Sequence, residues 1–291
     1  MRKTAAELMM ERETRVAYGP VPRRLLEAEL PEMSWQFRGK EFLLRALGDH
    51  YFYYRPNEGI VIERGHCVDP TGEALWLNGS IYSAIASING LVPIHASAVV
   101  VNGSVVAFTG PAGAGKSTLV AALGDRGLPM FCDDTLVLDL SGSDQITCLP
   151  GHKRLKLKSD ALQLTGAKPE EKVSVIVDKH YSQPASGTAT SAMPLGELIF
   201  LEEGARPRIT AITGAERFTR VVDDHYTADL YAGAQGFGPR DHFEHFAALA
   251  SRTKMSSFVR PCDASRFGEG LDLLMNYLGS NPVERADEDQ R

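Results

Sequence analysis

The chain has 291 residues, of which 43% are hydrophobic and 23% charged, and its formal net charge is −6. This length suits one large domain or two modest ones, with enough apolar side chains for a sizeable core. The acidic balance disfavours nucleic acid as a partner, because nucleic-acid binding needs clustered basic residues.

The sequence also lacks the signals that are typical of membrane, secreted and zinc-binding proteins. No apolar run is long enough to span a bilayer, so we expect no membrane contact. The N-terminal residues contain acids and lack the apolar core of a signal peptide. The four cysteines are scattered, without a C-x-x-C pair, which is typical of reduced thiols and gives no zinc signature. These features together predict a cytoplasmic protein.

The first 90 residues predict a small β-rich N-terminal region. Residues 1–15 are expected to form a frayed helix or a tail. Short β-type runs follow at 15–20, 32–38, 51–55 and 59–64, the last two joined by a P-N-E-G turn. The aromatic cluster at 51–54 favours core and edge packing, because aromatic side chains dominate cores. Residues 71–90 have apolar positions at helical spacing and end at Asn89-Gly90.

A β-hairpin is predicted next. Two apolar runs between Leu91 and Thr109 are joined by Asn102-Gly103, a strong signal for a tight hairpin turn. His95 lies at the start of the first run. An antiparallel hairpin that leads into a glycine-rich loop departs from a simple parallel arrangement, so we expect a mixed sheet.

The glycine-rich loop is the most informative motif in the chain. Residues 110–117 have the form G-x-x-x-x-G-K-S, a P-loop, between a β-type run and a helix-forming run that begins at Thr118. Backbone N–H groups of such a loop, with the following helix N-terminus, bind polyphosphate. Lys116 would reach the β- and γ-phosphates and Ser117 would ligate Mg²⁺. The sequence therefore predicts a nucleoside triphosphate site formed by Gly110, Pro111, Ala112, Gly113, Ala114, Gly115, Lys116, Ser117 and Thr118.

Two adjacent acids interrupt the next predicted strand. Asp133 and Asp134 lie within the run from Met130 to Leu140. A carboxylate that serves Mg²⁺ beside a P-loop stands at a strand end. Neighbouring residues of a regular strand point to opposite faces, so a bend is needed to present both acids. A surface turn is the alternative interpretation.

The most basic stretch of the chain is Leu149–Leu162. Arg154, Lys156 and Lys158 would share one face of a strand. They predict either a contact with phosphate or an acidic substrate, through Arg154 and Lys156, or a solvated edge strand.

The remaining elements are predicted from periodicity and composition. We expect a polar linker at 163–172, a strand at 173–181, and a loop at 182–193 that is either a lid or simply a loop. Strands at 195–202 and 208–212 are expected to pair. Helices at 215–230, 239–254 and 269–278 and a strand at 256–260 follow, and a charged, disordered tail ends the chain. The predicted organisation is residues 1–90, a catalytic domain over 91–280, and a tail over 281–291.

The order of His95, the hairpin, the P-loop and the Asp133-Asp134 pair resembles the catalytic domain of the HPr kinase/phosphorylase family over roughly residues 90–160. The resemblance implies an α/β P-loop kinase core with a mixed sheet, related to the nucleotide core of phosphoenolpyruvate carboxykinase. It implies Mg-ATP as phosphoryl donor and a serine hydroxyl as acceptor. By the same resemblance Asp133 is the base, Asp134 and Ser117 hold the metal, and His95 and Lys116 complete the catalytic set.

Two departures from the family bear on the acceptor. The glycine-rich signature used for phosphorolysis is absent, and P-G-H-K-R-L-K-L-K-S-D stands in its place. This stretch is similar to kinases of lasso-peptide precursors, which implies a peptide or small protein with an acceptor serine as partner. A non-catalytic ATP-binding regulator, a kinase of HPr and a kinase of free serine remain alternatives. The related enzymes form hexamers, so a homo-oligomer is compatible with the resemblance.

Overall fold

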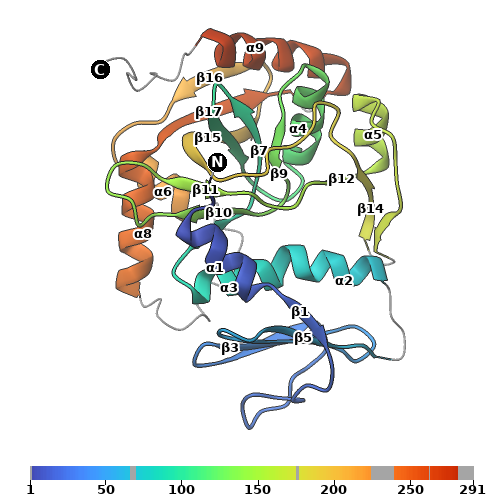
Figure 1. Ribbon diagram of the computed structural model, residues 1–291. Helices are drawn as coiled ribbons and strands as arrows, with labels where there is room; N and C mark the ends of the chain where they lie inside the picture. Colours follow the sequence, from blue (N-terminus) through green and yellow to red (C-terminus); the bar gives the residue numbers. More distant parts are fainter. Residues whose placement is uncertain (1, 66–69, 175–176, 224–238, 262, 281–291) are drawn as a thin grey trace.

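A computed structural model describes residues 2–65, 70–174, 177–223, 239–261 and 263–280 (Figure 1). The described helices are α1 (Ala5–Glu13), α2 (Pro70–Trp76), α3 (Tyr82–Ile88), α4 (Lys116–Asp125), α5 (Ser159–Thr165), α6 (Glu216–Asp223), α8 (Pro239–Arg252) and α9 (Phe267–Ser280). A π-helical turn, Leu77–Ile81, joins α2 to α3, and a short 3-10 helix, Ala264–Arg266, precedes α9. The fold is a mixed α/β arrangement of three sheets, in agreement with the predicted mixed sheet.

The N-terminal sheet has five strands in the order β1-β5-β4-β3-β2, and it forms the lowest layer in Figure 1. These strands are β1 (Val16–Tyr18), β2 (Ser34–Arg38), β3 (Glu41–Ala46), β4 (His50–Arg55) and β5 (Gly59–Glu63). Phe52 and Tyr54 of β4 are buried, as expected for the aromatic cluster. The turn before β5 places Asn57 at φ 65°, a conformation that asparagine tolerates. Strand β3, which sequence analysis did not identify, completes the antiparallel centre.

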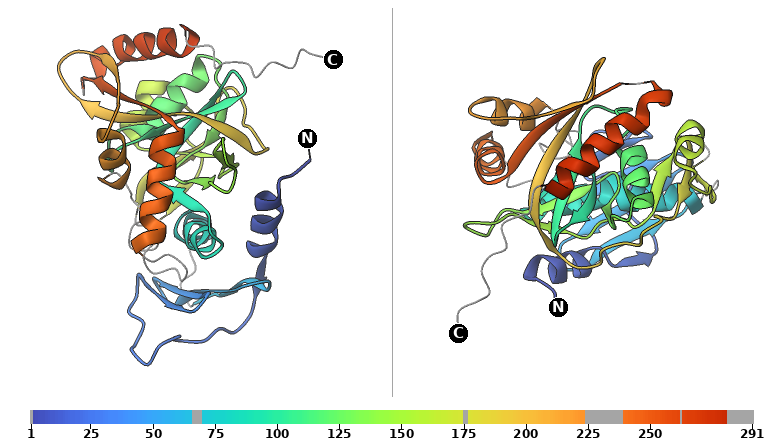
Figure 2. Two further views of the ribbon diagram at one scale, coloured as in Figure 1. Left: turned by 90° about the vertical axis from the view of Figure 1, so that its left-hand side faces the viewer. Right: turned by 90° about the horizontal axis from the view of Figure 1, so that it is seen from above.

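The continuous helix from α2 to α3 lies between this sheet and the rest of the molecule (Figures 1 and 2). Ile81 and Ile85 are fully buried in one cluster with side chains of β3, β4 and β5, and Val137 and Leu149 of the central sheet join the same cluster. The helix therefore packs the N-terminal sheet onto the central one. The predicted boundary at residue 90 falls at the end of this helix.

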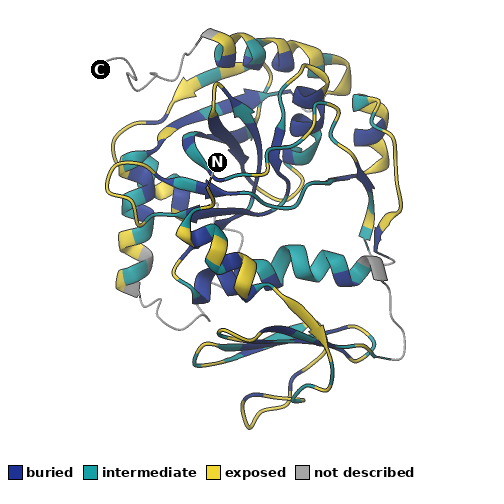
Figure 3. Ribbon diagram, in the orientation of Figure 1, coloured by how far each residue is buried: buried dark blue, intermediate teal, exposed yellow. Residues whose placement is uncertain are grey.

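The central sheet runs in the order β6-β10-β11-β15-β8-β7-β9, and β17 pairs with both β15 and β16. Its strands are β6 (Val92–Ile94), β7 (Ala96–Val101), β8 (Ser104–Thr109), β9 (Met130–Cys132), β10 (Leu136–Asp139), β11 (Thr147–Leu149), β15 (Met193–Glu203), β16 (Arg208–Ala211) and β17 (Lys254–Arg260). The hairpin of β7 and β8 is antiparallel, whereas β15 is parallel to both β8 and β17. Helices cover both faces: α4, α5 and α9 share one apolar cluster with the sheet, and α6 and α8 share another. Figure 3 shows the resulting buried centre.

A third, small sheet has the order β12-β14-β13, with β12 (Leu155–Leu157), β13 (Lys172–Ser174) and β14 (Val177–Ser182). The single strand predicted at 173–181 is wrong, because β13 and β14 are two antiparallel strands of a hairpin. All three residues of β12 are buried, so the alternative of a solvated strand is wrong, although β12 is an edge strand of its sheet. The predicted linker at 163–172 begins within α5, which ends at a left-handed Gly166.

Strand pairing in the central sheet contradicts one further prediction. β16 does not pair with β15, because β17 lies between them and is parallel to one and antiparallel to the other. Of the loop predicted at 182–193, Ser182 ends β14 and Met193 begins β15, and the residues between them form a loop. The tail at 281–291 and the end of the helix predicted at 215–230 lie outside the described residues. Among the helices that the structure describes, none has the length and apolar character needed to cross a bilayer.

The packing of α3 predicts a stability effect. Truncation of Ile85, which is fully buried, leaves a cavity between the two sheets. We expect Ile85→Ala to lower the free energy of unfolding by about 2–5 kcal/mol. Leu8→Ala is the control, because Leu8 is 55% exposed, and its change should stay within about 0.5 kcal/mol. Urea unfolding measures both, and equal effects would contradict this account of the interface.

Candidate functional site

The loop between β8 and α4 has the strand–loop–helix context expected for a P-loop. Thr109 ends β8, and Lys116 is the first residue of α4. Gly113 and Gly115 have φ of 87° and 79°, in the left-handed region that favours glycine. A Cβ atom at Gly115 would lie 2.4 Å from Nη2 of Arg260. The motif therefore needs glycine here both for its backbone conformation and for the close approach of an arginine.

Lys116 is held against its own loop. Its ammonium donates to the carbonyl oxygens of Gly110 at 2.7 Å and Pro111 at 3.1 Å. Of the residues predicted to bind nucleotide, those that line the pocket beside the loop are Gly113, Gly115, Lys116, Ser117 and Thr118. Gly110, Pro111, Ala112 and Ala114 shape the loop without lining the pocket.

Asp133 and Asp134 lie at the bend between β9 and β10, and their environments differ sharply. Asp133 is 1% exposed. Its Oδ1 accepts the hydroxyl hydrogen of Ser97 at 2.6 Å, and its Oδ2 accepts the backbone N–H of Lys156 at 2.9 Å. Asp133 does not line the pocket. In this structure its carboxylate joins β7 to β12 behind the site.

Asp134 faces the pocket because its backbone adopts φ 77°, which turns the chain at this position. Its Oδ2 lies 2.8 Å from Nζ of Lys156. Burial alone would raise the pKa of Asp134, but the positive charge and hydrogen bond of Lys156 outweigh it, and the pKa lies below its ordinary value. Burial likewise opposes the charge on Lys156, yet Asp134 keeps the pKa of that ammonium raised. Both groups are therefore charged at neutral pH.

His95 lies beside this ion pair. Its Nδ1 is 2.9 Å from the backbone oxygen of Asp134, which can only accept, so Nδ1 carries the hydrogen. The same nitrogen is 3.6 Å from Oδ1 of Asp134. Burial, and then the positive charge of Lys116, lower the pKa of His95. The imidazole is thus neutral at neutral pH and in a defined tautomer.

The two predicted substrate residues are placed differently. Lys156 lines the pocket but pairs with Asp134. Arg154 does not line it. Its guanidinium binds Glu170 at 2.5 Å and Glu171 at 2.7 Å, and it lies 4.1 Å from the ring centre of Tyr181. Arg154 therefore stabilises the small sheet around β14.

Two other lysines contribute to the same wall. Lys158 and Lys179 line the pocket. No carboxylate of the described residues lies within 4.0 Å of either ammonium. The positive charge of Lys179 is one of the causes that lower the pKa of Asp134. Sequence analysis placed Lys158 on the basic face but assigned it no role, and it did not single out Lys179.

The rest of the pocket lining comes from residues to which the sequence analysis assigned no role. They are Leu157, Asp160, Ala161, Leu164, Glu203, Arg260, Pro261, Asp263, Ala264 and Phe267. Nη2 of Arg260 donates to the backbone oxygen of Ala114 in the P-loop. Glu203 and Arg260 end the parallel strands β15 and β17, at the same sheet edge where β8 enters the P-loop. Ligands of open α/β sheets bind at the carboxyl ends of the strands. The positions of Glu203 and Arg260 at the ends of their strands could therefore have indicated that they line the site.

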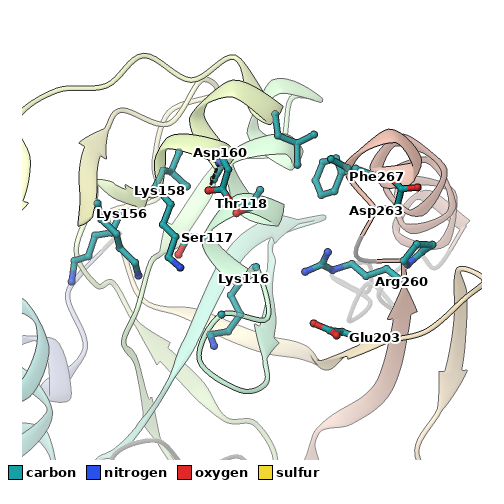
Figure 4. A pocket seen from close by; sticks show the side chains of 18 of the residues that line it. Lys116, Ser117, Thr118, Lys156, Lys158, Asp160, Glu203, Arg260, Asp263 and Phe267 are labelled. Carbon is teal, nitrogen blue, oxygen red and sulfur yellow. Dashed lines mark hydrogen bonds between the residues drawn. The ribbon is translucent and has the colours of Figure 1, made fainter. Parts of the chain in front are cut away.

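The pocket as a whole has a volume of about 340 Å³, within the range of small-molecule sites. Figure 4 shows Lys156 and Lys158 on one side, Arg260 and Phe267 on the other, and Lys116, Ser117 and Thr118 between them. Within the described part of the chain, no group of three or more His, Cys, Asp or Glu side chains is arranged to hold a metal. A P-loop site does not require one, because Mg²⁺ commonly takes one or two protein oxygens, with phosphate and water completing its shell.

The comparison with known proteins finds likeness among solved structures. No protein-family model matches the sequence, and no curated protein matches it either. Among solved structures, the chain is similar to the Hpr(Ser) kinase/phosphatase from Coxiella burnetii, with 15% sequence identity and a TM-score of 0.33. The match covers 65% of this chain and 94% of that one.

The Asp134–Lys156 pair predicts a pH-dependent coupling. Asp134 has a lowered pKa, so its contribution to stability is present above its ordinary value of 3.8 and is lost as pH falls through the folded value. Lys156 has a raised pKa, so its contribution is present below 10.5 and is lost as pH rises through the folded value. The coupling should therefore be constant between about pH 5 and 9.

A double-mutant cycle of Asp134→Asn and Lys156→Met measures this coupling by urea unfolding. Asparagine is chosen because it tolerates positive φ. We expect about 1–3 kcal/mol at pH 7 and a decline below pH 3.8. A coupling near zero at pH 7 would show that the two charges do not stabilise each other.

Proposed function

We propose that this protein is an ATP-dependent kinase that transfers the γ-phosphoryl group to a serine hydroxyl of a peptide or small protein. One observation carries the proposal: the P-loop residues Lys116 and Ser117 share a pocket with the charged Asp134–Lys156 pair. A P-loop alone supports nucleotide binding. A carboxylate in the same pocket adds a group that can accept a proton from a hydroxyl.

The donor end of the site is formed by the P-loop. Gly113, Gly115 and the first residues of α4 line the pocket, and backbone N–H groups at a helix N-terminus suit phosphate oxygens. Lys116 would exchange its two loop carbonyls for the β- and γ-phosphates. The Ser117 hydroxyl would fit Mg²⁺, a hard cation that prefers oxygen ligands. When bound, Mg²⁺ neutralises charge that develops on the phosphates.

The acceptor end is formed by Asp134 and its neighbours. In the proposed step the serine oxygen bonds to the γ-phosphorus, and the bond from that phosphorus to the β–γ bridging oxygen breaks. The hydroxyl proton passes to the carboxylate of Asp134, and ADP and phosphoserine result. Lys156 fixes the carboxylate, and His95 holds the peptide group of Asp134 through Nδ1–H. We assign the base role to Asp134 rather than Asp133, because both Asp133 oxygens already accept hydrogen bonds outside the pocket.

The class of acceptor is proposed from the positively charged side chains that line the pocket. Lys158 and Lys179 present ammonium groups to the pocket near Asp134, in place of the predicted Arg154. They suit an acceptor serine that is close to a carboxylate, such as the C-terminal serine of a peptide, which includes lasso-peptide precursors. The loop at 182–193 does not line the pocket, so nothing here favours its use as a lid or as the reporter of an ATP sensor.

Intact-mass spectrometry after incubation with Mg-ATP tests the acceptor class. The panel contains a peptide that ends in serine, an HPr protein and free serine, and Lys116→Ala is the inactive control. We expect a phosphoryl mass gain on the peptide. A gain on HPr or free serine alone would move the function to that acceptor. No gain on any of the three, with ATP still bound, would favour the non-catalytic regulator.

The base assignment is tested with a matched pair of variants. Asp134→Asn should bind Mg-ATP nearly as wild type but lose at least about 100-fold in transfer rate, because no proton acceptor remains. Asp133→Asn should mainly lower stability, by about 1–3 kcal/mol, since one of two buried hydrogen bonds loses its acceptor. A folded Asp133→Asn protein that cannot transfer phosphoryl would return the base role to Asp133. A drop in Mg²⁺-dependent ATP affinity in Asp134→Asn would assign Asp134 to the metal instead.

A further inference from the structure

We propose that the apolar gap between α5 and α9 binds the nucleobase of the donor, with Phe267 as its stacking partner. The inference rests on the proposed function, because it takes the P-loop to hold the triphosphate. It adds a binding site for a neutral, flat aromatic group, formed by Leu164 of α5 and Phe267 at the start of α9.

The expected position of the γ-phosphate indicates that the nucleobase lies in this gap. Asp134 and Lys156 mark the end of the pocket where the γ-phosphate meets the acceptor. The nucleoside must therefore leave the P-loop at the opposite end. Figure 4 shows Lys156 and Phe267 on opposite sides of the pocket, with Ser117 and Thr118 between them. A triphosphate that runs along the start of α4 would deliver its base to the side of Phe267.

The two ends of the pocket also differ in chemistry. The acceptor end carries the ammonium groups of Lys156, Lys158 and Lys179. At the other end most of the lining is apolar, with Leu164, Pro261, Ala264 and Phe267. The charged residues at this end are Glu203, Asp263 and Arg260, and the guanidinium of Arg260 donates to the backbone oxygen of Ala114. The three ammonium groups attract a polyphosphate to the acceptor end, and the apolar lining suits a neutral base, so the two ends favour the same direction of the nucleotide.

Phe267 is held in place to form one wall of the gap. It is partly buried, and it packs against the cluster that joins α4, α5 and α9 to the central sheet. The preceding turn is capped by Asp263, which accepts the backbone N–H of Ser265 at 2.9 Å and its hydroxyl hydrogen at 2.7 Å. A ring fixed in this way loses little conformational freedom when a base stacks on it.

Leu164 supplies the facing surface. It is 38% exposed, although leucine is a large apolar residue. Both its helix and α9 pack on α4, the helix that begins with the P-loop lysine. The width of the gap is thus set by the same core that positions the phosphate site.

Calorimetric titration with two ligands tests the proposal. Mg-ATP carries the base, whereas Mg-tripolyphosphate carries only the phosphates. We expect Phe267→Ala to weaken ATP binding by roughly 10-fold and to leave tripolyphosphate binding unchanged, because base–aromatic stacking contributes only to ATP. Phe267→Trp should restore ATP affinity. Phe243→Ala is the matched control, since Phe243 is 59% exposed on α8, outside the pocket, and should change neither affinity.

A second variant tests the same site in case Phe267→Ala impairs folding. Leu164→Asn alters a partly exposed side chain and should weaken ATP binding several-fold, again without an effect on tripolyphosphate. Unchanged ATP affinity in both Phe267→Ala and Leu164→Asn would overturn the base site, and so would equal losses for the two ligands. A wild-type protein that binds neither ligand would instead overturn the proposed function.

Discussion

The buried carboxylate of Asp133 is the contact on which the arrangement of the pocket depends. It accepts hydrogen bonds from Ser97 in β7 and from the backbone of Lys156 in β12, and so it connects the central sheet to the small sheet. A buried carboxylate without such donors would be strongly destabilising. Its two hydrogen bonds place Lys156 where the ammonium can meet Asp134. The two adjacent acids thus differ in role: Asp133 connects the two sheets, and Asp134 lines the pocket.

The pocket is assembled from segments that lie far apart in the sequence. The P-loop, the end of β17 and the starts of α5 and α9 meet around the first turn of α4. Arg260 shows how tightly they fit, because its guanidinium contacts the P-loop backbone at a position where only glycine leaves room. A substitution of Arg260 would therefore remove a contact with the backbone of residues 110–117, although Arg260 lies far from them in the sequence. Three ammonium groups lie at one end of the pocket, and most of the apolar lining lies at the other, beside Arg260 (Figure 4).

Local patterns predicted the elements well where short-range rules apply. The Asn102-Gly103 turn, the strand–loop–helix context of the P-loop and the bend at the paired acids are all present. Predictions failed where pairing partners are distant. The run at 173–181 was predicted as one strand, yet its described residues belong to two antiparallel strands, β13 and β14, of which β14 pairs with β12. The strands β15 and β16 are neighbours in sequence, but β17, some 50 residues later, fits between them.

The sequence by itself determined the P-loop, the acids beside it and the mixed sheet, because each depends on the properties of neighbouring residues. Tertiary structure decided which acid faces the pocket, since the hydrogen-bond partners that hold Asp133 away from it lie on β7 and β12. It also decided that Arg154 is sequestered by Glu170 and Glu171 while Lys179 lines the pocket. Side-chain roles of this kind depend on which distant segments pack together, and no local pattern encodes that.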